Sequence, residues 1–156
     1  MSLERYIENS WLRKEATSPQ EIADQLGIVS RCMKDANVEG ISDDLRFYTT
    51  FNAVLALANI ALRASGYRTA NQQGHHTRAI ETLEYTVQAD NKLIRKILAF
   101  SKKRNVSSYD SAGSISNEEL RRILTYCRGS AAYRLDMVAD DTSGVAGAAR
   151  SSPLMP

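Results

Sequence analysis

The sequence predicts an all-α protein, an up-and-down antiparallel helical bundle of four main helices with additional short helical segments. Apolar residues recur at spacings of three and four along most of the chain, which is the spacing of one face of an α-helix. Glycine and proline are scarce, at 8 and 3 residues, and they cluster in the connections. No internal repeat and no strand-like alternation of apolar and polar residues is visible.

Serine caps mark the starts of three expected helices. Ser18-Pro19-Gln20-Glu21 combines a capping Ser, a Pro at the first helical position and a Glu three residues after the Ser. Ser42 precedes the most apolar helix, which is expected to form the centre of the core, and Ser116 precedes the last one. The expected helical segments, in order, are residues 3–13, 18–37, 43–65, 75–86, 90–103 and 116–135.

The length and the charge balance indicate one domain without a general affinity for nucleic acid. We expect residues 1–138 of the 156 to form the bundle, and 139–156, rich in Gly, Ala and Ser, to be a disordered tail. With 20 basic and 18 acidic residues, the net charge is too small to predict a surface that binds nucleic acid over most of the protein. Local basic patches remain compatible with this charge balance.

The sequence also predicts a soluble, cytoplasmic protein that does not associate with a membrane. Its first five residues include charged side chains and do not begin the apolar run of a signal peptide. Its most apolar stretch, 51–62, is too short to span a bilayer and contains two Asn residues. Cys32 and Cys127 fall at apolar positions of expected helices. They indicate buried thiols in a reducing compartment, and a disulfide between them is the alternative.

The densest polar cluster is the run 102–110, which begins in the last residues of the expected fourth main helix. Arg presents planar donors to phosphate or carboxylate, and the neighbouring amide, phenol and carboxylate offer further donors and acceptors. An ordinary solvated helix end is the alternative, because cations are favourable near a helix C-terminus. The candidate ligand-binding residues of this run are Lys102, Lys103, Arg104, Asn105, Tyr109 and Asp110.

Asn52, His75 and His76 are further candidate ligand-binding residues. The two His residues titrate in the range of a general base, but adjacent helical residues point apart and have no metal-ligand spacing. The alternative to a functional role is that His75 or His76 caps the third helix or forms a hydrogen bond with a neighbouring helix. Asn52 places an amide in an apolar stripe, where it needs a partner, and another core group is the alternative. No metal and no cofactor is expected.

Several segments, in their order and spacing, resemble the HEPN superfamily over residues 3–137. They are the Ser18-Pro19 helix start, residues 43–53, residues 62–68, Gly74-His75-His76, and Arg104-Asn105 followed by Tyr109-Asp110. The closest resemblance is to small stand-alone prokaryotic members found beside nucleotidyltransferases or in toxin-antitoxin and defence systems. It implies a four-helix bundle, usually dimerised so that two motif regions face each other.

In active members of that family, an Arg followed by four to six residues and a His cleaves RNA without a metal. The Arg holds the scissile phosphate, and the His transfers protons to leave a 2′,3′-cyclic phosphate. Arg104 and Asn105 match this motif, whereas Tyr109 stands where the motif has His. A Tyr with an ordinary pKa of about 10 is a poor base near neutral pH, so the resemblance favours phosphate binding over catalysis.

A replacement for the missing His would have to come from His75 or His76. That requires the start of the third helix to lie near the end of the fourth. An up-and-down bundle is expected to keep these two regions of one chain apart.

The sequence leaves three hypotheses for function. The first is a HEPN-like module, dimeric, that binds nucleotide, RNA or a nucleotidyltransferase partner through residues 104–109, in a toxin-antitoxin or defence system. The second is a metal-independent endoribonuclease with Arg104 and Tyr109 as catalytic residues. The third is a structural helical adaptor. The excess of apolar surface on the second main helix further predicts a two-fold homodimer in which Arg104 and Tyr109 line a shared cleft.

Overall fold

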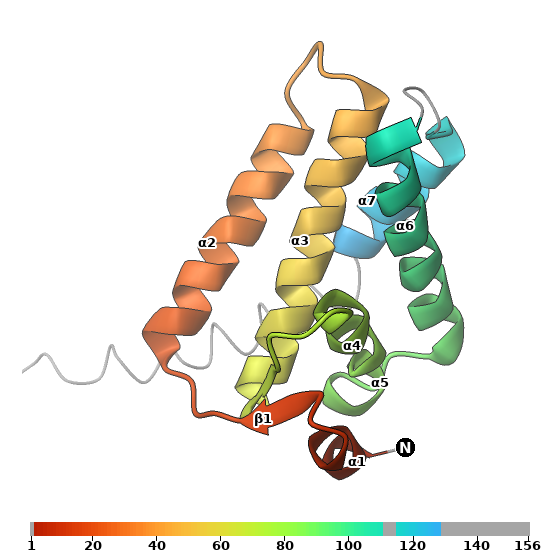
Figure 1. Cartoon of the computed structure of the whole chain (residues 1–156). Helices are drawn as coiled ribbons and strands as arrows, with labels where there is room; N and C mark the ends of the chain where they lie inside the picture. The colour runs from red at the N-terminus through yellow and green to blue at the C-terminus, as the bar shows by residue number, and fades with distance from the viewer. Residues whose placement is uncertain (1, 111–114, 129–156) are drawn as a thin grey trace, which may run out of the picture.

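The computed structural model describes residues 2–110 and 115–128, and these form an all-α bundle with one small two-stranded sheet. Its four long helices alternate in direction, which confirms the predicted fold class (Figure 1). The elements are α1 (Leu3–Glu8), β1 (Leu12–Lys14), α2 (Pro19–Ala36), α3 (Asp43–Ala64), β2 (Tyr67–Thr69), α4 (His75–Glu81), α5 (Leu83–Thr86), α6 (Asn91–Asp110) and α7 (Asn117–Arg128). The expected tail, 139–156, lies outside the described residues, as does the expected end of the last helix beyond residue 128.

The three predicted serine caps are confirmed. The Ser18 hydroxyl accepts a hydrogen bond from the Glu21 N–H at 3.1 Å, and the Ser42 hydroxyl accepts one from the Leu45 N–H at 3.2 Å. At α7 the bonds are reciprocal. The Ser116 hydroxyl accepts from the Glu119 N–H at 3.2 Å, and the Glu119 carboxylate accepts from the Ser116 N–H at 3.0 Å. These caps account for the agreement between expected and observed helix starts.

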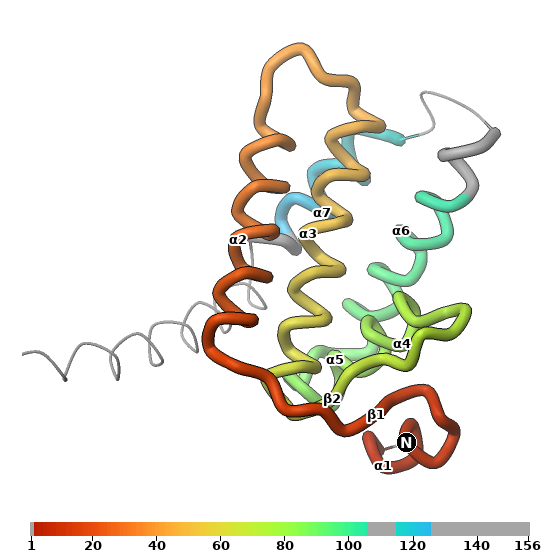
Figure 2. The backbone as a smooth tube through the Cα atoms, turned by 60° about the vertical axis from the view of Figure 1, so that its left-hand side comes forward, coloured from red at the N-terminus to blue at the C-terminus, as the bar shows by residue number. Residues whose placement is uncertain are grey.

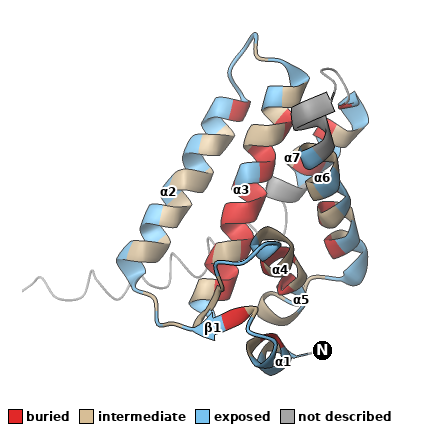
Figure 3. Ribbon diagram, in the orientation of Figure 1, coloured by how far each residue is buried: buried red, intermediate tan, exposed pale blue. Residues whose placement is uncertain are grey.

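Helix α3 is the centre of the hydrophobic core, as predicted (Figure 3). Phe47, Phe51 and Ile60 on this helix are fully buried. By length and composition alone α3 could cross a membrane, but 67% of its most apolar 18-residue stretch is buried inside the protein. That burial agrees with the core helix of a soluble protein, in which other helices rather than lipid cover the apolar surface.

The expected exposed apolar patch on this helix is not found in the described part of the chain, so the expectation is wrong. Helices α2, α4, α5, α6 and α7 all pack against α3. Leu45, at 50% exposure, is the large hydrophobic residue of α3 that remains exposed among the described residues. The single chain therefore covers the surplus apolar surface that the sequence assigned to a second copy.

Three expected elements differ from the observed ones. Residues 12–14 form β1, which pairs antiparallel with β2, and strands of three residues are too short for alternation to appear in the sequence. The expected helix 75–86 is split at the buried Thr82, whose hydroxyl donates to the Ala79 carbonyl at 2.8 Å. Helix α6 continues past Lys103 to Asp110, because no Gly or Pro ends it. The polar run 102–110 is therefore helical.

Candidate functional site

Helix α4 brings the two histidines to one side of the bundle. Gly74, just before it, has a φ of 86°, a left-handed conformation that glycine adopts without strain. Two turns of helix follow, and their residues Ala79 and Ile80 are completely buried in the core. The start of α4, with His75 and His76, is therefore fixed relative to α3 by the packing of its own second turn.

The N-terminal segment holds α4 from beneath (Figure 2). The Arg78 guanidinium lies 3.5 Å from the ring centroid of Trp11 and also pairs with Glu81 at 2.9 Å. The Tyr6 hydroxyl donates to the same Glu81 carboxylate at 3.4 Å. Arg78 and Glu81 thus have structural roles: they hold α4 against the N-terminal segment and belong to a different set of contacts from His75 and His76.

Arg104 projects from α6 toward the core rather than toward open solvent. Its side chain is half-buried, and its guanidinium carbon lies 5.8 Å from the ring centroid of Phe51 on α3. A guanidinium within about 6 Å of an aromatic centroid is attracted by the ring. Because Phe51 is itself completely buried, it is a rigid support beneath the Arg104 side chain.

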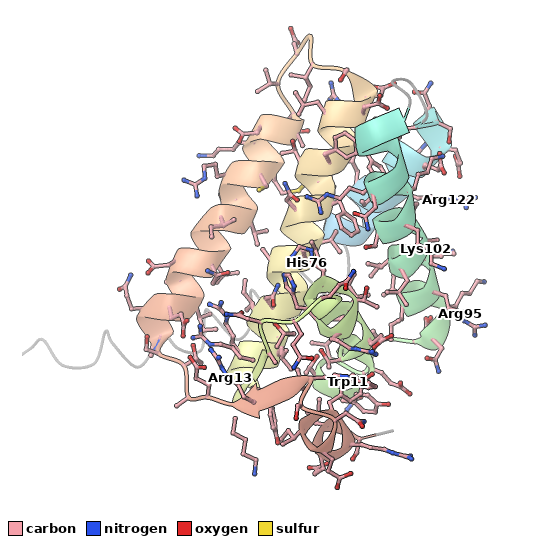
Figure 4. All side chains as sticks on the ribbon, in the orientation of Figure 1. Trp11, Arg13, His76, Arg95, Lys102 and Arg122 are labelled. Atoms are coloured by element: carbon pink, nitrogen blue, oxygen red, sulfur yellow. The ribbon has the colours of Figure 1, made fainter. Side chains whose placement is uncertain are left out.

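His76 lies close enough to Arg104 for their charges to interact. Burial lowers the pKa of the half-buried His76 below its ordinary 6.5, and the positive charges of His75 and then Arg104 lower this pKa further. The His75 and His76 rings meet edge to face with centroids 4.0 Å apart, and His75 Nδ1 lies 3.2 Å from the Gln72 carbonyl oxygen. Figure 4 shows His76 at the start of α4, beside α3.

The expectation that the bundle keeps the histidines away from the end of the fourth helix is therefore wrong. It assumed a third helix running the full length of the bundle. Helix α4 instead ends at Glu81, the chain turns through α5, and α6 runs back along the molecule in contact with α4. The resulting proximity brings together two predicted site residues, Arg104 and His76, from segments far apart in the sequence.

The two lysines before Arg104 lie elsewhere. Lys103 Nζ lies 2.6 Å from each carboxylate oxygen of Glu119, and this ion pair joins α6 to α7. Burial raises the pKa of Glu119, but hydrogen bonds from Lys103 and Ser116 outweigh it and hold that pKa below the usual value. Lys102 is exposed and, two residues from Arg104, points to the opposite face of α6. Lys103 is thus a structural residue, and Lys102 is separate from the Arg104 site.

The remaining candidates are only partly placed. Asn105 is exposed on α6 next to Arg104. Asn52 is also exposed, so the argument that burial obliges it to find a partner is wrong, because it lies on the one stripe of α3 that reaches the surface. Tyr109 and Asp110 lie in the last turn of α6, and their side chains lie outside the described part.

Neither a metal centre nor a reactive thiol emerges from the described residues. Among them, no group of three or more His, Cys, Asp or Glu side chains could hold a metal ion. Cys32 is a free, half-buried cysteine whose pKa is raised chiefly by burial, which disfavours the reactive thiolate. Because Cys32 is free, the alternative of a disulfide between Cys32 and Cys127 is not found.

The lowered pKa of His76 predicts a pH-dependent stability. Between its unfolded pKa of about 6.5 and its lower folded pKa, the unfolded chain binds more protons, so the contribution of His76 to stability is complete above about pH 7 and is lost as the pH falls. The free energy of unfolding should therefore fall less between about pH 7.5 and about pH 5 in His76→Gln than in the wild type. Urea titrations at both pH values measure this difference, and equal losses in both proteins would contradict the prediction.

Comparisons with protein-family models, with curated proteins and with solved structures found no match for this chain, so the HEPN resemblance rests on the sequence motifs alone.

Proposed function

We propose that this chain is a HEPN-like helical module that binds a phosphodiester group of RNA or a nucleotide between Arg104 and His76. One observation carries the proposal: α4 packs against α6, and this contact brings the half-buried His76 within reach of the charge of Arg104, although 27 positions of other sequence separate them. A half-buried guanidinium near a half-buried imidazole offers two kinds of N–H donor in a partly desolvated place. Such a place favours an anion, because hydrogen bonds to charged groups are stronger where water is partly excluded.

The two side chains offer complementary donors to phosphate. A guanidinium presents several N–H groups in one plane and can bind two phosphate oxygens at once. His76, with its pKa below 6.5, is largely neutral at pH 7 and carries one ring N–H as a donor. A bound phosphate would raise the pKa of His76, because its negative charge stabilises the imidazolium.

Binding of a fluorescein-labelled, single-stranded RNA tests the proposal by anisotropy. A hydrogen bond to a charged group contributes about 1.5–3 kcal/mol, so Arg104→Gln should weaken binding roughly 10- to 100-fold. Arg31→Gln is the matched control, because Arg31 is exposed on α2 and its loss changes the net charge equally. If Arg104→Gln and Arg31→Gln bound the RNA as tightly as each other, the proposal would fail.

A second candidate function, metal-independent RNA cleavage, is favoured by the neutral state of His76 near Arg104. In this reaction His76 takes the proton of the 2′-hydroxyl, whose oxygen attacks the adjacent phosphorus. The bond from phosphorus to the 5′-oxygen breaks, that oxygen takes up a proton from water, and a 2′,3′-cyclic phosphate remains. Arg104 would stabilise the charge that develops on the phosphoryl oxygens.

Incubation of single-stranded RNA with the protein in EDTA separates catalysis from binding alone. Cleavage that leaves 2′,3′-cyclic ends and is lost in His76→Gln would support the enzyme, since removal of a general base costs about 10²–10⁴-fold in rate. Absence of cleavage at high protein concentration, with binding intact, would leave the chain a binding module.

The remaining parts of the proposal derive from the resemblance. They are a cytoplasmic homodimer, a nucleotidyltransferase partner and a role in a toxin-antitoxin or defence system. Arg104 and His76 belong to one chain, so phosphate binding does not depend on the dimer. Light scattering at tens of micromolar tests the dimer separately. The half-buried state of Arg104 argues against the third hypothesis, an adaptor with a solvated basic helix end.

A further inference from the structure

Helix α6 concentrates the positive charge of the protein. It contains six of the chain's 20 basic residues and one of its 18 acidic residues. The net charge of the whole chain is only +2, so this distribution is local. Local clusters of one sign create potentials that attract oppositely charged partners even when the net charge is small.

Three of these cations form a line on the exposed face of α6. Lys92, Arg95 and Lys102 occupy positions separated by three and seven residues, with the exposed Ala99 between the last two. Counted through Ala99, the successive spacings are three, four and three residues, and side chains at these spacings lie on one face of an α-helix. The opposite face of α6 is buried and carries Ile94, Ile97 and Phe100. We call Lys92, Arg95 and Lys102 the outer stripe.

The outer stripe is unneutralised within the described residues. No carboxylate among them forms an ion pair with Lys92, Arg95 or Lys102. The Arg95 Nε donates only to the backbone carbonyl of Asn91, at 3.2 Å. In Figure 4, Arg95 and Lys102 point away from the bundle on the side opposite His76.

We propose that the outer stripe binds the phosphate backbone of the same RNA strand whose phosphodiester lies at Arg104 and His76. The ligand is then an oligonucleotide rather than a mononucleotide. From Lys92 to Lys102 the helix rises about 15 Å, a length that several successive phosphates can follow. This inference rests on the proposed function and adds to it the class of ligand and a second contact surface.

The chemistry of the stripe favours a nucleic acid backbone over other anionic partners. The cores of protein interfaces are rich in aromatic residues and poor in Lys, and the outer stripe has no aromatic or large apolar residue. A helix lying on a membrane needs an apolar face for the lipid, whereas the apolar face of α6 is buried against α3, α4 and α5. A line of flexible cations without an apolar anchor matches the sequence-independent contacts made to phosphates.

The two surfaces are close enough for one strand. Around the helix axis, the exposed Asn105 lies between Arg104 and Lys102. The helix with its side chains is about 10–12 Å across, so a strand that leaves the Arg104 site passes over Asn105 and reaches the outer stripe within a few nucleotides. Asn105, the predicted polar ligand beside Arg104, thus lies on the path between the two surfaces.

The experiment compares two labelled probes, a diuridylate and an oligouridylate of about 12 nucleotides, a length within the roughly 4–16 nucleotides of single-strand-binding folds. The stripe variant is Lys92→Gln/Arg95→Gln/Lys102→Gln. Its matched control, Lys14→Gln/Arg31→Gln/Lys34→Gln, removes three exposed cations from β1 and α2. Dissociation constants are measured across a range of salt concentrations for the wild type and for both variants.

We expect the stripe variant to bind the diuridylate as the wild type does and to bind the oligouridylate at least tenfold more weakly. Three lost phosphate contacts, each contributing about 0.7 to the slope of log K against log salt, should reduce that slope by about 2. The control variant should keep the wild-type slope. An unchanged slope in the stripe variant, or an equal reduction in the control, would overturn the inference.

Two further outcomes separate this inference from the proposed function. If Arg104→Gln left diuridylate binding unchanged while the stripe variant lost the oligouridylate, the phosphate site would fail and the stripe would stand as an RNA surface by itself. If the stripe variant instead lost binding to vesicles of anionic lipid or to polyglutamate and kept the oligouridylate, the stripe would serve a different anion and the inference would be overturned.

Discussion

Replacing Phe47 with Ala is expected to lower the free energy of unfolding by about 3–5 kcal/mol, the largest effect of any single substitution considered for this chain. Phe47 is completely buried, and its ring lies 5.6 Å from that of Phe100 on α6 and 6.5 Å from that of Phe51. The truncation removes the burial of the ring, the aromatic contacts between helices and the packing density around them. Urea denaturation followed by circular dichroism measures the loss.

Leu45→Ala is the control for that measurement. Leu45 lies on the same helix, two residues earlier, and is 50% exposed, so its truncation removes little buried surface. Its expected cost is below about 1 kcal/mol. If Phe47→Ala cost no more than Leu45→Ala, α3 would not be the core helix that the structure describes.

Ile80→Ala should cost about 2–5 kcal/mol and should also loosen the candidate site. Ile80 is completely buried and is the main apolar anchor of α4, the short helix that begins with His75 and His76. A cavity at Ile80 weakens the packing of α4 and lets water reach His76. The pKa of His76 should then rise toward its ordinary value, because burial is the main cause of its depression.

Two measurements check this coupling between core and site. Urea denaturation gives the stability, and proton NMR of the histidine ring gives the pKa of His76. Val38→Ala, at a position that is 51% exposed, should change neither. A destabilised Ile80→Ala protein with an unaltered His76 pKa would mean that α4 does not determine the environment of that histidine.

The sequence predicted the helical architecture well where local chemistry determines it. The hydroxyls of Ser18, Ser42 and Ser116 each satisfy an N–H of the first turn, so the helix starts could be located without knowledge of the tertiary structure. The apolar periodicity of residues 43–65 likewise identified the central helix, because burial on several sides requires apolar residues on several sides.

The parts that failed depend on tertiary contacts. The short strands β1 and β2 exist because residues 12–14 lie against residues 67–69, and a three-residue strand has no detectable pattern of its own. The break at Thr82 determines where α4 ends and therefore which part of α6 it contacts. That break was invisible in the sequence, so the approach of His76 to Arg104 could not be predicted from it.

The candidate site was predicted as a set of residues rather than as an arrangement. Arg104 and His76 were both candidates, but the sequence assigned Lys102 and Lys103 to the same cluster as Arg104. Helical geometry separates them, because α6 continues through the whole run and directs consecutive residues to different faces. Had the helix ended at Lys103, as expected, the cluster could have converged.

The pKa of His76 in the wild type and in Arg104→Gln is the most direct test of the account. Only two histidines occur in the chain, so His75→Gln assigns their resonances without ambiguity. We predict that His76 titrates below 6.5 in the wild type and that its pKa rises when Arg104 is neutralised, because a positive charge nearby disfavours the imidazolium. An identical His76 pKa in both proteins would mean that Arg104 and His76 do not face each other, and the phosphate site would lose its basis.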